Sequence, residues 1–176
     1  HGIELFMALR DPATFLPSVA AEMKGATLED LMQGFDPREF RWSTLVARLR
    51  EAAPEIPVTL WCYEDSPLLW GAVLRALGGL PPDTRIAGAF DMMAEIMTPQ
   101  GMQRFRAYLG KHPELTEPLK MRVMAAFLEK FAIDEKVEEV LDVPGWTEET
   151  VAALTAAYEA DVAELSEMPG VRMLAV

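Results

Sequence analysis

Cysteine and histidine are scarce in this sequence. Its 176 residues include one cysteine, Cys62, and two histidines, His1 and His112. A single cysteine excludes an intramolecular disulfide framework and is typical of a reducing compartment, so we expect a cytoplasmic protein. Structural zinc sites draw their ligands mainly from cysteine and histidine, so the sequence also predicts no metal site.

Basic side chains and long apolar stretches are scarce as well. Lysine and arginine total 16 against 28 aspartates and glutamates, which gives a net charge of −12. Proteins that bind nucleic acid neutralise its phosphates with basic side chains, so we expect no nucleic-acid partner. Since no window of about 18 uncharged apolar residues occurs, we also expect no transmembrane helix and no membrane partner.

The composition otherwise matches a globular domain with a substantial core. Hydrophobic residues make up 51% and charged residues 25% of the sequence, and a chain of this length ordinarily forms one domain. The acidic charge is concentrated late, because residues 113–176 carry 5 basic and 14 acidic side chains. Pro81-Pro82 marks the expected boundary between an α/β portion, 1–80, and a helical portion, 81–176, that packs on it within a single domain.

A first β-strand followed by a helix is predicted near the start of the sequence. Ile3–Arg10 is short and mostly apolar, as expected for a strand of a parallel sheet that is covered on both faces. Asp11 then suits the N-cap of a helix and Pro12 its first position, where a missing N–H costs nothing. We expect this helix to continue to about Lys24 and to end at Gly25.

Pro57–Tyr63 repeats this pattern later in the sequence. It is rich in β-branched and aromatic residues, and Glu64–Pro67 follows it as a turn into a helix that ends at Leu77. Parallel strands need such helical crossovers, so Pro57–Tyr63 and Ile3–Arg10 are predicted to be parallel, with both carboxyl ends at one edge of the sheet. Two strands are too few for an independent sheet, so further strands are expected in weaker segments or upstream.

Helical periodicity dominates the rest of the sequence. Helices are predicted over Ser43–Ala53, Thr98–Leu109, Pro118–Phe131 and from Thr147 to Leu165. The last of these has an apolar face made of Val151, Leu154, Tyr158, Val162 and Leu165. The predicted fold class is therefore α/β, a parallel sheet with flanking helices and a mostly helical C-terminal half.

The candidate site consists of Arg10, at the end of the first strand, and Ser18, eight residues later. An arginine at the carboxyl end of a parallel strand points into the crevice where α/β folds bind ligands. Its guanidinium matches a phosphate bidentately, and the start of the following helix favours the same anion. Two structural alternatives stay open: Arg10 pairs with Asp11 or another nearby carboxylate, and Ser18 bonds the carbonyl four residues back.

Other polar residues are candidates with alternatives of their own. Glu64 and Asp65 are either paired acid and base carboxylates or a turn and cap ahead of Pro67. Cys62 lies in an apolar run and is expected to be an inert thiol. A small group of arginines either faces an anionic acceptor or forms a solvated helix face: Arg38, Arg41, Arg48 and Arg50.

Three segments resemble the sulfotransferase family, whose members use 3′-phosphoadenosine 5′-phosphosulfate. LRDPATFLPS, Leu9–Ser18, is similar to the family's second cofactor motif, in which an arginine and a serine eight residues later hold the 3′-phosphate. WCYEDSPLLWGAVLRALGG, Trp61–Gly79, resembles the family's strand that ends in Tyr-Glu-Asp and the helix after it. YEADVAEL resembles its C-terminal helix through Tyr158, Asp161 and Leu165.

The resemblance implies a P-loop NTPase-like fold and a bacterial-type cytoplasmic sulfotransferase-like protein. Such a protein transfers a sulfuryl group to a hydroxyl or amine of a small-molecule or glycan acceptor, and Arg10 and Ser18 are then its cofactor-binding residues. The family's glycine-rich phosphate loop and catalytic histidine are expected upstream of Ile3, since no Gly-x-x-x-x-Gly-Lys pattern occurs in these residues. No catalytic residue is assigned within them.

A protein of another class is the alternative. The chain is then a catalytically inactive sulfotransferase-fold binding protein or an oligomeric interaction protein. Its acidic last third would pack against a second copy or a basic partner, and a homodimer is the simplest such assembly.

Overall fold

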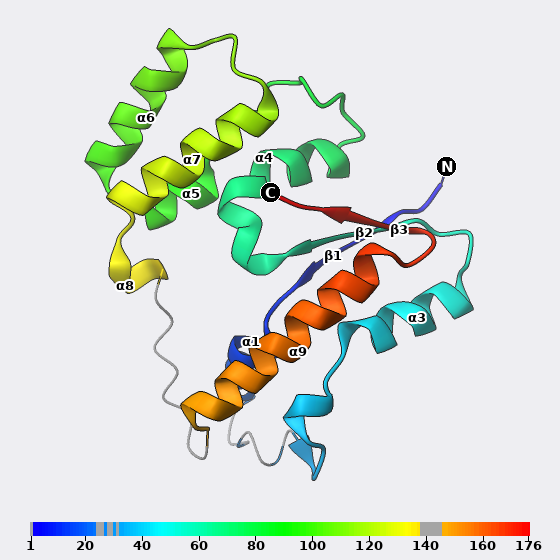
Figure 1. The fold of residues 1–176 in the computed structure, drawn as a ribbon. Coiled ribbons are helices and arrows are strands. Elements are labelled where there is room, and N and C mark those ends of the chain that lie inside the picture. Colours follow the sequence, from blue (N-terminus) through cyan, green and yellow to red (C-terminus); the bar gives the residue numbers. More distant parts are fainter. Residues whose placement is uncertain (1, 24–26, 28–29, 31, 138–145) are drawn as a thin grey trace. The chain divides into compact units, whose positions relative to one another are not determined.

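The computed structural model describes residues 2–23, 27, 30, 32–137 and 146–176. The chain forms two compact units. The sheet unit comprises His1–Tyr63 and Val140–Met173, and the helical unit comprises Glu64–Glu139 and Leu174–Val176. The sheet unit is therefore built from two segments that lie far apart in the sequence, drawn from blue to cyan and from orange to red in Figure 1.

A three-stranded sheet forms the centre of the sheet unit (Figure 1). In order, its neighbouring strands are β1 (Leu5–Leu9), β2 (Val58–Cys62) and β3 (Val171–Leu174). β1 and β2 are parallel, in a register that pairs Leu9 with Cys62. The N–H of Val58 donates to the carbonyl of Gly170 at 3.2 Å, so β2 and β3 begin at the same end. The predicted α/β fold class with a parallel sheet is confirmed, and both predicted strands are present.

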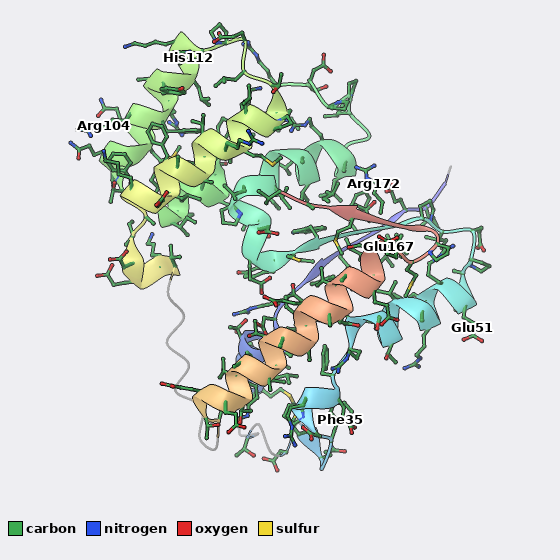
Figure 2. All side chains as sticks on the ribbon, in the orientation of Figure 1. Phe35, Glu51, Arg104, His112, Glu167 and Arg172 are labelled. Carbon is green, nitrogen blue, oxygen red and sulfur yellow. The ribbon has the colours of Figure 1, made fainter. Side chains whose placement is uncertain are left out.

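β3 is a strand that the sequence pattern does not predict. It has four residues, and Arg172 within it is exposed (Figure 2). So short a segment with a charged side chain gives little strand signal of its own. The turn before it depends on Gly170, whose φ of +77° lies in the left-handed region that favours glycine. β3 is therefore specified by its pairing with β2 more than by its own sequence.

The two predicted strands are less completely buried than the sequence predicts. In β1 only Leu9 is buried, and the other four residues are partly exposed. In β2 the first three residues are buried, whereas Trp61 and Cys62 are partly exposed. Within the described part of the sheet, β1 stands at the end of the strand order and pairs with β2 alone, which leaves it less covered than a central strand.

The described helices of the sheet unit are α1 (Pro12–Glu22), the 3₁₀ turn η1 (Pro37–Glu39), α3 (Trp42–Ala52) and α9 (Glu148–Ser166). Asp11 caps α1 as predicted, because its Oδ1 accepts the N–H of Ala13 at 2.8 Å, and Pro12 takes the first helical position. The predicted end of this helix, at Lys24 and Gly25, lies outside the described residues.

Helices α1, α3 and α9 contribute to one core with the sheet. Its buried members come from strands and helices alike: Leu9, Trp42, Val46, Val58, Leu60, Tyr158 and Leu165. Phe15 of α1 packs against this core, with its ring centroid 5.0 Å from that of Trp42. Cys62 packs there too, as expected for a thiol in an apolar run. The core holds α9 against the sheet even though the two lie far apart in the sequence.

A buried carboxylate joins α9 to the start of α3. Asp161 is 3% exposed, and its Oδ2 accepts the backbone N–H groups of Trp42, at 2.6 Å, and Ser43, at 3.2 Å. N–H groups in the first turn of a helix have no acceptor within that helix, and Arg41, at the N-cap position, makes no side-chain capping bond. Asp161 therefore caps α3 from another helix, with its negative charge at the positive end of the helix dipole.

The helical unit contains α4 (Ser66–Leu77), α5 (Asp91–Ile96), α6 (Pro99–Lys111), α7 (Glu117–Phe131) and α8 (Asp134–Val137). Its core is rich in methionine and consists of Met93, Met97, Met102, Phe105 and Met124. Helices α4, α6 and α7 are close to their predicted bounds, whereas α5 and α8 are too short to give a periodic signal. None of the helices in the described residues is long and apolar enough to cross a membrane.

Glu117 links two helices of the helical unit. Its Oε2 lies 2.6 Å from Arg75 Nη2 on α4, and its Oε1 lies 2.7 Å from Lys120 Nζ on α7. Partial burial raises the pKa of Glu117, but hydrogen bonds and positive charge from Lys120 and Arg75 outweigh it, so the pKa lies below its usual value. The ionised carboxylate therefore stabilises the folded helical unit.

Asp161→Asn should lower the free energy of unfolding by about 2 kcal/mol, because a neutral amide replaces the charged acceptor at the buried start of α3. Urea denaturation followed by tryptophan fluorescence measures the loss, since Trp42 lies in the same core. Glu164→Gln removes a charge from an exposed position of α9 and is the matched control, with an expected change below about 0.5 kcal/mol. Equal losses in the two variants would contradict the capping role.

Glu117→Gln should destabilise the helical unit at neutral pH, by less than about 1 kcal/mol because the carboxylate is partly solvated. A lowered folded-state pKa gives stability that is fully present above the usual glutamate pKa of about 4.3 and is lost as the pH falls through the lower value. The difference from wild type should therefore shrink in acid. Thermal melts followed by circular dichroism at pH 7, 5 and 3 test this, and a difference that stays constant or grows in acid would contradict it.

Candidate functional site

The carboxyl ends of β1 and β2 place Arg10 and Tyr63 next to each other. Leu9 and Cys62 are paired in the sheet, so the residues after them leave it at the same edge, as predicted. The guanidinium carbon of Arg10 lies 5.0 Å from the centroid of the Tyr63 ring, a cation–π contact. Arg10 is partly buried and Tyr63 is 43% exposed. This edge is the one at which α/β folds ordinarily bind ligands.

Helix α1 brings together the two predicted site residues, Arg10 and Ser18. Nη1 of Arg10 donates to Oγ of Ser18 at 3.2 Å, and the same Oγ donates to the carbonyl of Phe15 at 2.8 Å. The serine thus contacts the arginine and also bonds a preceding carbonyl, three residues back where the sequence suggested four. The two interpretations of Ser18 are compatible, because one hydroxyl accepts and donates at once.

Thr14 is a third member of this site that the sequence pattern did not single out. Nε of Arg10 donates to Oγ1 of Thr14 at 2.9 Å, and this Oγ1 donates to the carbonyl of Asp11 at 3.2 Å. Thr14 lies one helical turn before Ser18, so the two hydroxyls share a face of α1. That spacing is the signal by which the sequence could have revealed it. We refer to Arg10, Thr14 and Ser18 as the arginine cluster.

Side chains from other helices hold the turn Leu9–Asp11, which carries the arginine. The carbonyls of its first two residues accept hydrogen bonds from the Tyr158 hydroxyl, at 3.2 Å, and from Nε1 of Trp42, at 2.9 Å. The third residue accepts at Oδ2 from Oγ1 of Thr155, at 2.6 Å. Each residue of the turn is therefore bonded to α3 or α9, and the arginine leaves a turn with a defined conformation.

The pair Glu64 and Asp65 lies in a 3₁₀ turn, η2 (Tyr63–Asp65), ahead of α4. Asp65 takes the N-cap position of α4, but its side chain makes no capping hydrogen bond. Burial raises the pKa of Asp65, and the negative charge of Glu64 raises it further. The cap position is confirmed without the capping bond, and the acid–base interpretation of this pair stays a prediction.

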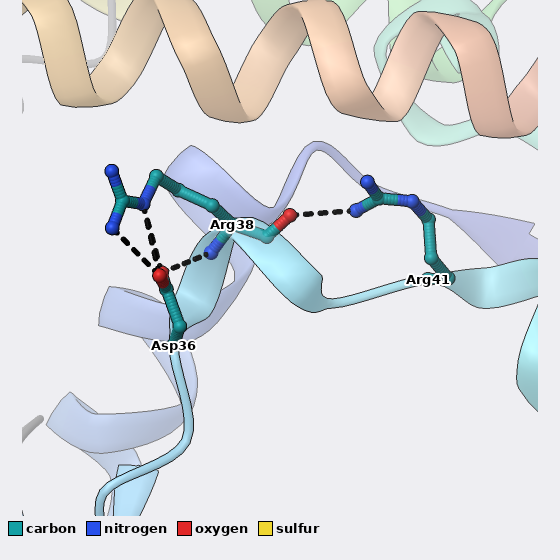
Figure 3. Close-up of polar contacts among 3 residues, drawn as sticks. All are labelled: Asp36, Arg38 and Arg41. Atoms are coloured by element: carbon teal, nitrogen blue, oxygen red, sulfur yellow. Dashed lines mark hydrogen bonds and ion pairs between the residues drawn. The ribbon is translucent and has the colours of Figure 1, made fainter.

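The predicted group of arginines makes local contacts, most of them near η1 (Figure 3). Nη2 of Arg38 lies 2.7 Å from Oδ2 of Asp36, and hydrogen bonds from Arg38 hold the pKa of that carboxyl below its usual range. Nη1 of Arg41 donates to the carbonyl of Arg38 at 2.8 Å. Away from this group, Nη1 of Arg50 donates to the carbonyl of Ile56 at 2.5 Å. Arg48 is exposed on α3. These contacts favour structural and solvated roles over an acceptor surface.

His112 lies at the end of α6 in the helical unit (Figure 2). Its ring centroid is 4.4 Å from that of Tyr108, and its Nδ1 is 3.2 Å from Oε1 of Glu114. Both contacts are local, made with residues within four positions of His112 in the sequence. Across the ranges that the structure describes, no group of three histidine, cysteine, aspartate or glutamate side chains is arranged to hold a metal ion.

No family model matches the chain, no curated protein matches it, and no solved structure matches its fold. An α/β architecture with a parallel sheet serves many unrelated activities, so the fold alone does not decide the function. The function must be inferred from the chemistry of the arginine cluster and the turn that carries it.

Proposed function

We propose that this chain is a sulfotransferase-like protein with a P-loop NTPase-like fold. In this proposal Arg10 and Ser18 bind the 3′-phosphate of 3′-phosphoadenosine 5′-phosphosulfate. The observation that carries the proposal is the hydrogen bond between these two side chains, which the resemblance implied as partners on one phosphate. The acceptor is a hydroxyl or amine on a small molecule or a glycan.

The local chemistry at the end of β1 suits a phosphate. The guanidinium of Arg10 presents several donors in a fixed plane that matches two phosphate oxygens. The Ser18 hydroxyl lies 3.2 Å from Nη1 of Arg10 and donates its proton to the carbonyl of Phe15, so it binds a phosphate by turning that proton from the carbonyl to a phosphate oxygen. Helix α1 begins two residues after Arg10, at Pro12, and the carboxylate of Asp11 already caps its first turn, so the charge that favours a phosphate here is that of Arg10. These features favour binding of a dianionic phosphate, whereas an uncharged ribose hydroxyl would interact only weakly with them.

The residues described here account for binding and selection. The sulfuryl group passes in line from the nucleotide to the acceptor. The bond between its sulfur and the 5′-phosphate oxygen breaks, adenosine 3′,5′-bisphosphate leaves, and the acceptor hydroxyl or amine releases its proton as the new bond forms. Arg10 and Ser18 hold the nucleotide by its 3′-phosphate and exclude nucleotides that lack this group, so their contribution to catalysis is positioning. We assign the catalytic base to none of these residues. A relative that binds the nucleotide without transferring the group is the second candidate, because the arginine cluster serves binding alone equally well.

Adenosine 3′,5′-bisphosphate should raise the melting temperature of the full chain. A ligand at 100 times its dissociation constant stabilises the folded state by about 2.7 kcal/mol. Adenosine 5′-monophosphate, which lacks the 3′-phosphate, should give a much smaller shift. Arg10→Ala should abolish most of the difference between the two nucleotides, and differential scanning fluorimetry measures all of these shifts.

Arg48→Ala is the matched control, since it removes an exposed arginine from α3 in the same unit. It should leave both nucleotide shifts as in wild type. The proposal fails if wild type shows no shift with millimolar bisphosphate, or if both nucleotides shift the melting temperature equally. Equal effects of Arg10→Ala and Arg48→Ala would also contradict it. A preference for the bisphosphate without sulfuryl transfer to any acceptor would favour the binding protein.

A further inference from the structure

The orientation of the Arg10 side chain is not fixed by the strand that carries it. Arginine has a long side chain with many rotamers, and binding an anion requires that its guanidinium be held in one of them. A site that orders the guanidinium before the ligand arrives binds more tightly, because less conformational freedom is lost on binding. The residue that orders Arg10 therefore affects affinity without touching the ligand.

Thr14 lies where its side chain can hold the Arg10 guanidinium in one orientation. Its Oγ1 accepts the inner nitrogen of the guanidinium, Nε, at 2.9 Å. The single proton of this hydroxyl is directed to the carbonyl of Asp11, at 3.2 Å, so its oxygen faces the arginine as an acceptor. That carbonyl belongs to the residue after Arg10. The Thr14 hydroxyl therefore links the guanidinium of Arg10 to the backbone next to it.

The contact with Thr14 occurs together with a contact between Arg10 and Ser18. With Nε bonded to Thr14, Nη1 lies 3.2 Å from Ser18 Oγ, one turn further along α1. The ring of Tyr63 lies against the guanidinium as well, 5.0 Å from its carbon. A guanidinium held in this way approaches a phosphate with its terminal nitrogens, next to the serine hydroxyl.

We propose that Thr14 is a positioning residue that holds Arg10 in the orientation required to bind a 3′-phosphate, and so sets the preference for nucleotides that carry one. This inference rests on the proposed function, since it concerns the same anion site. Thr14 contributes a hydroxyl acceptor to Arg10 and makes no contact with the ligand. Its loss should weaken recognition of the 3′-phosphate and leave recognition of the rest of the nucleotide unchanged.

The test measures dissociation constants by calorimetry on the full chain, for adenosine 3′,5′-bisphosphate and adenosine 5′-monophosphate. Thr14→Val keeps the shape and removes the hydroxyl. It should weaken binding of the bisphosphate about tenfold, as expected for loss of a hydrogen bond to a charged group, and leave the monophosphate unchanged. Thr14→Ser restores the hydroxyl and should restore the wild-type ratio. Thr44→Val, on an exposed residue of α3, is the control and should change neither constant.

Each outcome separates this inference from the proposed function. If wild type does not prefer the bisphosphate, the proposed function fails and the role of Thr14 fails with it. If wild type prefers it and Arg10→Ala loses the preference while Thr14→Val keeps it, only the role of Thr14 is overturned. Equal weakening of both nucleotides by Thr14→Val, or no rescue by Thr14→Ser, shows a structural role and also overturns it. Circular dichroism checks folding, and Thr14→Ala replaces Thr14→Val if the latter does not fold.

Discussion

The hydrogen bonds from the start of α3 to the carboxylate of Asp161 hold much of the sheet unit in place. They fix where α3 begins, and α3 begins with Trp42, whose indole donates to the carbonyl of Arg10. The same helix that carries Asp161 also carries Tyr158 and Thr155, which bond the residues on either side of the arginine. A single face of α9 thus both caps α3 and braces the turn that presents the arginine cluster. Removing the carboxylate would leave N–H groups buried without a partner, which is far more costly than losing an exposed contact.

The arginine cluster combines a mobile type of side chain with rigid surroundings. The two hydroxyls that accept from Arg10 lie on α1, and each hydroxyl also donates to a backbone carbonyl. Helix α1 begins at Asp11 and Pro12, a cap and a proline that fix its first turn from local sequence alone. The position of the hydroxyls therefore follows from how the helix starts, and the position of the arginine follows from where the strand ends. In such a site the helices and strands fix the positions of the functional residues, and hydrogen bonds between side chains then fix the orientation of each functional group.

The features that the sequence predicted are those with local causes. A short apolar run followed by Asp-Pro or Glu-Asp-Ser-Pro specifies a strand and a helix start within a few residues, and both strands were found, parallel as expected. Arg10 and Ser18, which the sequence singled out by their spacing, are in hydrogen-bond contact in the structure. Asp161 shows what local patterns miss. Asp161 is buried because its carboxylate accepts the backbone N–H of Trp42, 119 positions away in the sequence. The apolar periodicity of the helix does not reveal this partner. β3 was not predicted for the same reason, because its stability comes from pairing with the neighbouring strand.

The order of the elements along the chain has a consequence for how the protein is made. Among the described elements of the sheet unit, β1 comes first in the sequence and α9 and β3 come last, and the described helices of the helical unit lie between them. Domains generally fold as units while the chain leaves the ribosome from its N-terminus. The carbonyl of Leu9 finds its partner, Tyr158, 149 positions later. The helical unit has all of its helices available earlier, so it can collapse first. Helices α1 and α3 can pack on the sheet before α9 emerges, but the part of the core that Tyr158 and Leu165 fill stays open until then, so the nascent chain exposes apolar surface during that interval.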